Sequence, residues 1–428
     1  MMKIAFYTFG CRLNQAETAI IQQSFTGNSY QVVDYRQSPD VLIVNTCTVT
    51  ENGDADTRRL INRMVRQNPG VQIALVGCQA QVQRDKLLEL PNVRWVVGNG
   101  AKMNMEKILR ESAGETPRVI TPTIRKENFT VPFIGIDPHH TRANLKIQDG
   151  CDFFCSFCEI PYARGRARSR EFNDLVNEAR QLAEHGFHEL VLTGINIGTY
   201  RDSGHTLPDV LEALESIEPL WRIRISSIEP TTIAGRIIER MASGGKLCRY
   251  LHVPLQSGSN KILRAMQRNY SVEEYTDFIR NVSDAVPGIC LGTDVIVGFP
   301  GETEADFEET YQLLLDLPLA YFHVFSYSER QHAKSSRIAE SEKNSRGEIA
   351  RRSQRLRELS RRKRNVYFQQ FVGKTELVLF EQQKNGYWTG LTDTYIRVNV
   401  NSQHDLKNRL LPVRLEQIDR QTIRGVLQ

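Results

Sequence analysis

The chain has 428 residues, of which 40% are hydrophobic and 25% are charged, so it can bury the cores of about three ordinary globular domains. It contains no uninterrupted apolar run of membrane-spanning length, and Arg12 and Glu17 break its apolar start, which argues against a membrane helix and a signal peptide. We therefore expect a cytoplasmic protein whose eight cysteines serve metal binding, catalysis or packing rather than disulfides.

Apolar β runs alternate with helix-length polar segments over the first hundred residues, which predicts a parallel sheet covered by helices. The clearest expected strands cover residues 3–8, 40–46 and 72–77. A cysteine follows closely on each of them: Cys11, Cys47 and Cys78. Because the carboxyl ends of parallel strands share one edge of a sheet, these thiols should meet. We interpret them as ligands of an iron–sulfur cluster rather than as three buried thiols.

Residues 121–140 contain Pro122, Pro132 and Pro138 and are expected to link two domains. A longer alternation of strands and helices follows, and its six βα units predict a partial TIM-like barrel with its active site at the carboxyl ends of the strands. The expected strands cover 143–147, 189–193, 222–226, 250–255, 290–297 and 321–327, and the clearest helices cover 173–185, 272–285 and 303–317.

Three further cysteines, Cys151, Cys155 and Cys158, follow the first barrel strand with the spacing C-x3-C-x2-C. A loop of this spacing can hold three corners of a [4Fe-4S] cluster and leave one iron open to a small ligand. The alternative is structural zinc, but such sites favour paired cysteines and four ligands, and no second pair or histidine is nearby. Phe157 is expected to shield the cluster and to pack on a ligand's ring. The remaining Cys248 and Cys290 are expected to pack as small hydrophobic residues.

Small or polar residues stand at the ends of the other barrel strands, where they would admit or bond a ligand. The residues expected to contact a bound cofactor, in addition to Phe157, are Thr193, Gly194, Ser226, Glu229, Gln256, Val295 and Gly298. Glycine, serine and proline are common in loops, so each strand end alone is weak evidence for a site. Four such strand ends at matching positions, near residues 192–196, 226–230, 252–259 and 294–300, favour a pocket. Glu229 could instead cap a helix, and for His252 we expect a hydrogen bond to the backbone.

The net charge of +5 conceals a basic segment over residues 345–364, in which nine cationic and two acidic side chains give a local charge of +7. This segment is expected to be helical over 346–370, and the short β runs that follow it are typical of a small β-barrel that binds RNA. A second basic run alternates arginine over residues 164–170 and would point its guanidinium groups to one side if extended. The alternatives are a solvated loop for this run and a solvated face for the basic helix. The expected RNA contacts are Arg164, Arg166, Arg168, Arg355 and Arg362.

Taken together, five motifs resemble those of the radical S-adenosylmethionine (SAM) methylthiotransferases. They are FGCRLNQ around Cys11, NTCTVT around Cys47, GC at Cys78, the Cys151 loop with the following RGR run, and DVIVGFPGE from Asp294. The resemblance covers nearly the whole chain and implies an α/β protein with three domains. These would be an N-terminal methylthiotransferase domain over 1–120, a radical SAM core over 137–368 and a TRAM RNA-binding domain over 370–428.

The same resemblance implies two [4Fe-4S] clusters. Cys151, Cys155 and Cys158 would hold the one that cleaves SAM, and Cys11, Cys47 and Cys78 would hold an auxiliary one. One SAM would methylate sulfur on the auxiliary cluster, and a second would yield the radical that takes hydrogen from C2 of an adenine, where the methylthio group is placed. The implied partners are the anticodon stem-loop of tRNA and an electron donor of the flavodoxin or ferredoxin type. No catalytic residue is expected beyond the cluster ligands, and the sulfur donor is open.

Within this family, NTCTVT followed by Asp54 and Asp56 resembles the MtaB type, which acts on N6-threonylcarbamoyladenosine beside the anticodon. The types that act on isopentenyladenosine or on a ribosomal protein are alternatives. A radical enzyme that inserts sulfur into a small molecule would share both clusters but should lack the basic helix and the terminal barrel. A non-catalytic RNA-binding protein with a structural metal is the other competing class. It would share the C-terminal segment but should contain zinc and be colourless.

Overall fold

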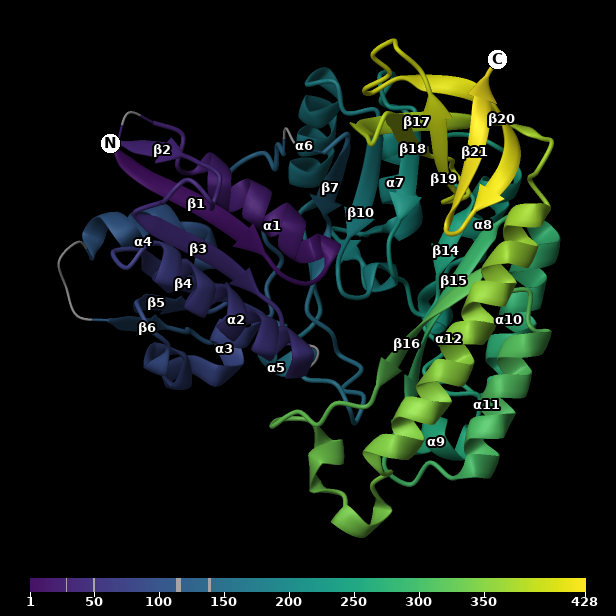
Figure 1. Ribbon diagram of the computed structural model, residues 1–428, viewed down its shortest axis with the longest axis horizontal. Coiled ribbons are helices and arrows are strands. Elements are labelled where there is room, and N and C mark those ends of the chain that lie inside the picture. The colour runs from purple at the N-terminus through teal and green to yellow at the C-terminus, as the bar shows by residue number, and fades with distance from the viewer. Residues whose placement is uncertain (28, 49–50, 113–116, 138–139) are drawn as a thin grey trace.

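The computed structural model describes residues 1–27, 29–48, 51–112, 117–137 and 140–428. Figure 1 shows an α/β sheet at the N-terminus, a partial barrel in the middle of the chain and a small closed β-barrel at the C-terminus. The expected fold class is confirmed, whereas the residue limits of the three domains stay predictions. Val49 and Thr50 of the NTCTVT motif and Pro138 of the expected linker lie outside the described residues.

The N-terminal sheet is parallel, with the strand order β2-β1-β3-β4-β5-β6. Its strands are β1 (Met2–Thr8), β2 (Tyr30–Val32), β3 (Val41–Thr46), β4 (Gln72–Gly77), β5 (Val93–Val97) and β6 (Arg118–Ile120). Its helices are α1 (Arg12–Gln23), α2 (Glu51–Gln67), α3 (Cys78–Gln83) and α4 (Met105–Glu111), with 3-10 turns η1 (Arg84–Glu89) and η2 (Lys102–Asn104). Every residue of β3 is buried, as expected for a central strand with helices on both faces. The three strands expected from the sequence are confirmed.

The middle of the chain forms the partial barrel as two three-stranded parallel sheets, β7-β10-β13 and β14-β15-β16. A bridge between Ser227 and His252 joins them into one curved wall. The strands are β7 (Arg142–Lys146), β10 (Glu189–Thr193), β13 (Arg222–Ile225), β14 (Tyr250–His252), β15 (Cys290–Val297) and β16 (Tyr321–Ser326), with short pairs β8 (Gln148–Asp149) and β9 (Arg168–Ser169), and β11 (Arg201–Asp202) and β12 (His205–Thr206). All six expected barrel strands are confirmed, some of them with shorter ends.

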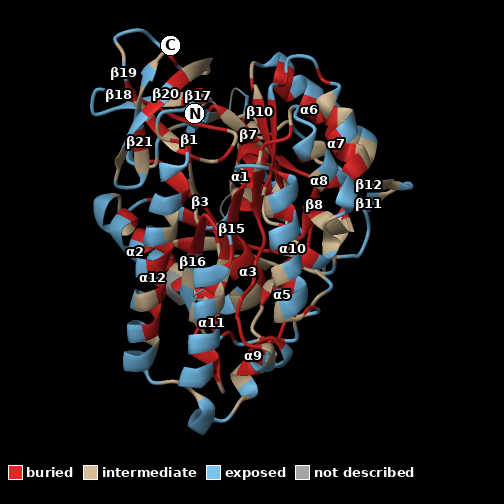
Figure 2. Ribbon diagram, turned by 90° about the vertical axis from the view of Figure 1, so that its right-hand side faces the viewer, coloured by how far each residue is buried: buried red, intermediate tan, exposed pale blue. Residues whose placement is uncertain are grey.

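Helices follow the barrel strands and cover their outer side. They are α5 (Ile160–Arg164), α6 (Phe172–Glu184), α7 (Leu207–Glu215), α8 (Gly235–Ala242), α9 (Asn260–Ala265), α10 (Val272–Ala285), α11 (Glu304–Asp316) and α12 (Arg346–Gln369), with 3-10 turns η3 (Ile197–Thr199), η4 (Pro230–Thr232), η5 (Lys334–Arg337) and η6 (Glu340–Glu342). Both open edges of the barrel are covered, because α1 packs against β7 and α12 packs against β16. Figure 2 shows the buried strands inside and the exposed faces of the helices outside. Within the described residues, no helix is long and apolar enough to cross a membrane.

The C-terminal strands close in the order β17-β18-β19-β21-β20. They are β17 (Thr375–Lys384), β18 (Tyr387–Leu391), β19 (Arg397–Asn401), β20 (Leu410–Asp419) and β21 (Thr422–Leu427). Alternating apolar residues such as Val378, Phe380 and Val413 fill the small barrel, and its core continues into Cys248 and Cys290 of the larger one. Both cysteines are buried, as the expected packing role requires.

Candidate active site

The three N-terminal cysteines lie at one edge of the parallel sheet. Thr8 pairs with Asn45, and Thr46 pairs with Gly77, so the ends of β1, β3 and β4 are level. Gly10 has a positive φ, and a methyl group added to it would lie 2.9 Å from the Sγ of Cys47. The chain before Cys11 therefore approaches Cys47 closely, and only glycine allows this contact.

The second cysteine triplet forms a tight loop after β7 and β8. The backbone N–H of Cys158 donates to the carbonyl of Cys155, and the N–H of Cys151 donates to Gly165. Burial raises the pKa of Cys151 to about 11, and burial together with the neighbouring Cys155 also raises the pKa of Cys158. The Sγ of Cys155 accepts a hydrogen bond of 3.2 Å from Arg268, which also pairs with Glu229. These thiols are close together beside one guanidinium group, a setting that suits a site for negatively charged sulfur.

A buried ion cluster joins the N-terminal part to the barrel. It comprises the carboxylates of Glu17 and Asp149 and the cations of Lys102, Lys146, Arg164 and Arg168. Two carboxylates leave a cationic excess, and a buried excess charge is costly unless another anion is nearby. Arg164 and Lys102 are close enough to Cys78 to interact with its charge, and Asn99 donates to the Sγ of Cys78 at 3.6 Å. The N-terminal thiols therefore fit an anionic iron–sulfur cluster.

The prediction that Arg164 contacts RNA is wrong. The residue is fully buried at the C-terminus of α5, and its guanidinium nitrogens bind Glu17, Asp149 and Asn14. Gly165 follows with a φ of 77°, so the expected extended run of alternating arginines does not form. The physical reason is a turn that the glycine permits, which sends Arg164 inward.

The other arginines expected to contact RNA differ in their exposure and in their ion pairs. Arg166 is exposed and lies 4.3 Å above the ring of Phe154, whereas Arg168 is mostly covered and pairs with Asp149. Arg355 pairs with Glu308 and Glu304 of α11, and Arg362 donates to Tyr311. The helix therefore presents less free positive charge than its local sequence charge suggests.

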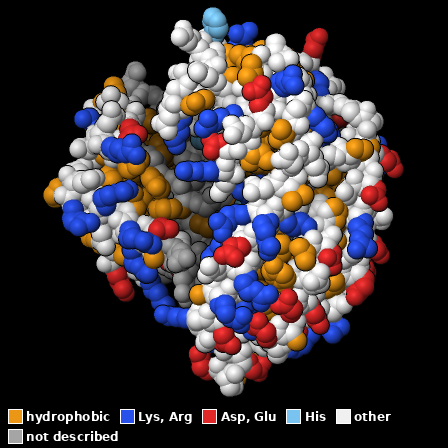
Figure 3. Space-filling model, turned by 45° about the vertical axis from the view of Figure 1, so that its right-hand side comes forward, with side chains coloured by type: hydrophobic (Ala, Val, Ile, Leu, Met, Phe, Trp, Pro, Cys, Tyr) orange, Lys and Arg blue, Asp and Glu red, His pale blue; other side chains and the backbone are white. Residues whose placement is uncertain are grey.

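A cavity of about 910 Å³ lies between the N-terminal sheet, the barrel and the C-terminal strands. This volume is at the upper end for small-molecule sites and is ample for a nucleotide base. Cys11 and Cys47 line it, together with the expected cofactor residues Thr193, Gly194 and Ser226. Figure 3 shows a face of the molecule that is hollowed between two lobes, with Lys and Arg side chains along the rim of the hollow.

A second cavity of about 160 Å³ adjoins the first, and Asp294 and Phe325 line both. Cys158, Phe157 and Gln256 line the smaller one, as expected for residues near a cofactor. Of the other residues expected to contact a cofactor, Glu229 is held by Arg268, Val295 is buried in the barrel core and Gly298 packs against Ile349. Glu229, Val295 and Gly298 line neither cavity. The expected SAM contacts, which also include Phe157, Gln256, Thr193, Gly194 and Ser226, all stay predictions.

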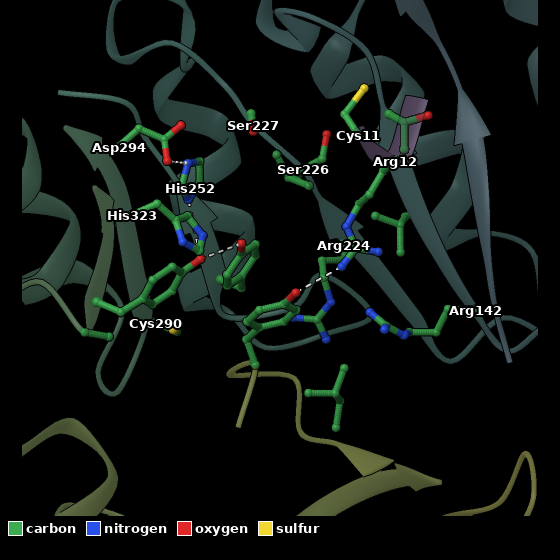
Figure 4. A pocket seen from close by; sticks show the side chains of 18 of the residues that line it. Cys11, Arg12, Arg142, Arg224, Ser226, Ser227, His252, Cys290, Asp294 and His323 are labelled. Atoms are coloured by element: carbon green, nitrogen blue, oxygen red, sulfur yellow. Dashed lines mark hydrogen bonds and ion pairs between the residues drawn. The ribbon is translucent and has the colours of Figure 1, made fainter. Parts of the chain in front are cut away.

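His252, Asp294 and His323 form a polar group on the barrel wall of the larger cavity (Figure 4). The Nε2 of His252 lies 3.0 Å from Asp294, and its Nδ1 faces the hydroxyl of Tyr321 at 3.4 Å. The expected hydrogen bond from His252 to the backbone is not found among the described residues, because its ring nitrogens face the side chains of Asp294 and Tyr321 instead. The three side chains could each offer one ligand atom to a metal ion, and Asp294 is the one carboxylate among them.

The two cysteine loops are also tied directly to each other. Thr48, beside Cys47, donates its hydroxyl to Glu159, beside Cys158, at 2.9 Å. Arg330 is buried and bridges the two sides, because it donates to Thr48, Glu159 and Asp54. The relative placement of the two loops is thus set by buried hydrogen bonds rather than by surface contacts.

Sequence reasoning missed Arg268, Arg142 and Arg224. Arg268 lies 113 residues from the cysteine that it contacts, and no local pattern points to it. Arg142 and Arg224 lie in barrel strands and line the larger cavity. Arg12 belongs to the FGCRLNQ motif and breaks an apolar run, but no role was assigned to it, although its position beside Cys11 was a signal that it belongs to a site.

Comparison with known proteins places these features in context. Two family models match: the Radical SAM superfamily over residues 145–314, and the uncharacterized protein family UPF0004 over residues 3–98. The chain is 35% identical over 426 residues to the threonylcarbamoyladenosine tRNA methylthiotransferase MtaB of Bacillus subtilis (strain 168), covering 97% of this chain and 94% of that relative. It is 37% identical to the MtaB of Aquifex aeolicus (strain VF5), covering 93% and 96% of the two chains.

A more distant relative is the tRNA-2-methylthio-N(6)-dimethylallyladenosine synthase of Thermodesulfovibrio yellowstonii, 30% identical over 98% of this chain and 97% of its own. Among solved structures, the radical SAM methyltransferase TsrM of Kitasatospora setae has a TM-score of 0.57 at 14% identity, covering 76% of this chain and 73% of its own. At that identity the likeness concerns the fold alone.

Proposed function

This chain belongs to the MtaB family of radical SAM tRNA methylthiotransferases, and from that premise we propose that it adds a methylthio group to C2 of N6-threonylcarbamoyladenosine next to the anticodon of tRNA. The observation that carries the proposal is the pair of adjoining cavities. One contains Cys11 and Cys47, the other contains Cys158, and Asp294 lies between them. A base in the larger cavity would therefore lie within reach of both cysteine sites. A tRNA substrate also places the proposed reaction in the cytoplasm.

Each part of the chain has a role in this proposal. Cys151, Cys155 and Cys158 would hold one [4Fe-4S] cluster, and Cys11, Cys47 and Cys78 would hold the other. When bound, the first supplies the electron that cleaves SAM, and the second supplies the sulfur site. The protein's share is to hold the reactants in line, to exclude water and, through Phe157 at the wall of the smaller cavity, to shield the Cys158 side.

Recognition of tRNA would rest on the exposed basic side chains and the C-terminal barrel. Arg362 and Arg166 are the strongest candidates for phosphate contacts, because Arg362 hydrogen-bonds to a tyrosine rather than to a carboxylate, and Arg166 is more than half exposed and has only a long ion pair of 3.5 Å with the exposed Asp152. Arg168 and Arg355 would have to exchange an existing ion pair for a phosphate. An electron donor of the flavodoxin or ferredoxin type would complete the system.

The direct test uses the anaerobically reconstituted enzyme with SAM, a reductant and anticodon stem-loops. We expect 2-methylthio-N6-threonylcarbamoyladenosine from the threonylcarbamoyl stem-loop, detected by mass spectrometry of nucleosides, and little product from the dimethylallyl stem-loop. Loss of the same nucleoside from tRNA of cells that lack this chain would support the result. Product from the dimethylallyl stem-loop alone would overturn the proposal.

Replacing Arg268 with Gln should make the midpoint potential of the Cys151-loop cluster more negative, because a cation that hydrogen-bonds to sulfur favours the reduced form. A charged hydrogen bond worth about 1.5 kcal/mol corresponds to roughly 60 mV for one electron. Anaerobic spectroelectrochemistry measures the shift. Arg268→Lys retains the charge and should recover much of the potential, and equal potentials for Arg268→Gln and the unaltered chain would contradict this role.

A further inference from the structure

Three arginines from different elements share one wall of the larger cavity. Arg12 is the first residue of α1, Arg142 begins β7 and Arg224 lies in β13. Figure 4 shows their guanidinium groups on the side of the cavity away from His252, Asp294 and His323. We call Arg12, Arg142 and Arg224 the arginine wall. The cavity thus has a side with three guanidinium groups and an opposite side with two imidazoles and one carboxylate.

The positive charge of the arginine wall is only partly matched. Arg224 is satisfied, because it pairs with Glu189 at 2.7 Å and donates to backbone carbonyls of the C-terminal part. Arg142 pairs with Glu381, but its Nη1 has no hydrogen-bond partner in the described part of the chain and lies 3.8 Å from Glu189. The two N–H groups of this buried nitrogen make no hydrogen bond to the described residues, so the charge of Arg142 is only partly matched beside the cavity.

Arg12 is the least compensated of the three. Among the described residues no carboxylate lies within ion-pair distance of it, and its Nη2 donates to the hydroxyl of Tyr395 at 3.0 Å. A cation at the first position of a helix is also disfavoured by the helix dipole, so local helix stability does not explain this arginine. An anion at this place would be stabilised by both the helix end and the guanidinium group.

The phenol of Tyr395 lies within the positive potential of the arginine wall. Burial alone would raise the pKa of its phenol, but the guanidinium groups of Arg12 and Arg142 lower it instead. The ring lies 5.3 Å from the guanidinium carbon of Arg224. The region between the N-terminal sheet and the C-terminal barrel is therefore organised to receive a negative group.

We propose that the arginine wall, with Arg12 as the main contact, binds the carboxylate of the threonylcarbamoyl group and so selects an anionic N6 substituent over an apolar one. This inference rests on the proposed function. In adenine, C2 and C6, which carries N6, both flank N1 and share one edge of the base. A base that presents C2 toward Cys11 therefore presents its N6 substituent beside the neighbouring Arg12. A dimethylallyl group has no charge to offset the guanidinium groups, which would remain desolvated and unpaired.

The test compares equilibrium binding of two stem-loops to the reconstituted enzyme with both clusters. One carries threonylcarbamoyladenosine, and the other carries its carboxamide, which has the same shape without the charge. We expect the unaltered enzyme to prefer the carboxylate by about 30-fold, in the range of a charged hydrogen bond, and Arg12→Gln to reduce this preference to about threefold. Arg12→Lys, which keeps the charge, should retain most of it.

The matched control is Arg36→Gln. Arg36 also donates to a tyrosine hydroxyl, that of Tyr35 at 3.1 Å, but it is exposed and does not line the cavity. This variant should keep the full preference. Because Arg12 is next to Cys11, the iron content of each variant is measured first. If Arg12→Gln binds less iron, the test of charge recognition is the comparison of the two stem-loops on the unaltered enzyme.

Two outcomes would overturn the inference. Equal affinity of the unaltered enzyme for the carboxylate and the carboxamide stem-loops would exclude charge recognition, even if the enzyme methylthiolates threonylcarbamoyladenosine and the proposed function holds. An unchanged preference in an iron-replete Arg12→Gln variant would assign the recognition to other residues. Failure of the proposed function is separate, because it would be seen as activity on the dimethylallyl stem-loop alone, and it would remove this inference as well.

Discussion

Replacing Cys47 with alanine should halve the iron and labile sulfide of the anaerobically reconstituted protein, from about eight to about four irons per chain. Cys47 follows the central strand β3 and lies between the loops that carry Cys11 and Cys78. Two remaining thiolates cannot hold three corners of a cubane. The methylthiolated nucleoside should fall below detection, while cleavage of SAM at the Cys151 loop should continue.

The control for this variant is Cys248→Ala. Cys248 is also buried, but it packs in the core shared with the C-terminal barrel and belongs to neither triplet. It should keep the full iron content and lose about 1 kcal/mol of stability, as is common for a single core substitution. An iron content in Cys47→Ala equal to that of the unaltered chain would mean that the N-terminal cysteines hold no cluster.

Replacing Glu17 with glutamine should lower the free energy of unfolding by about 3 kcal/mol, because it leaves buried cations without their shared counter-ion. Glu17 is fully buried and contacts Arg164, Lys102 and Lys146. Asp149 still balances Arg164 and Lys146, and burial already lowers the pKa of Lys102, so that this lysine can release its proton. These two effects limit the expected decrease in the free energy of unfolding. For a chain of 428 residues that unfolds as one unit, the midpoint of thermal unfolding should fall by roughly 3 °C.

The same residue predicts a dependence of stability on pH. Burial alone would raise the pKa of Glu17, but Arg164, Lys102 and Lys146 hold it well below its ordinary value. The contribution of Glu17 to stability is therefore fully present above about pH 4.3, the ordinary pKa of a glutamate in an unfolded chain. It is lost as the pH falls through the lower pKa of Glu17 in the folded protein. Glu17→Gln should show a weaker loss of stability in acid. The exposed Glu89→Gln should match the unaltered chain, and a Glu17→Gln melting curve that also matches it would refute the role of the ion cluster.

The sheet, the barrel and the cysteine placement could be predicted because they follow from local patterns. Strands that read VLIVNT or IALVG have few alternatives, and a cysteine that closely follows each parallel strand must reach the same edge. The CDFFCSFC spacing is equally local. These features do not depend on which distant residues pack beside them.

The electrostatics of the site could not be predicted in this way. Arg164 belongs to an alternating basic run, but the turn at Gly165 and the carboxylates of Glu17 and Asp149, 147 and 15 residues away, draw it inward. On α12, the charge of Arg351 and Arg355 is offset by Glu304 and Glu308, which lie 47 residues earlier. Counts of charge along the sequence contain no information about such partners.

The contact between Tyr395 and Arg12 limits how freely the C-terminal barrel of this enzyme can be exchanged for another. Tyr395, just before β19, contacts Arg12, which is next to Cys11, although 383 positions separate Tyr395 from Arg12 in the chain. The C-terminal barrel therefore contributes to the wall of the larger cavity, whether or not it also binds the tRNA as proposed. Exchanging this barrel for that of a relative would alter the shape and polarity of the cavity proposed for the base, so a change meant to affect tRNA affinity alone should also affect which base is accepted.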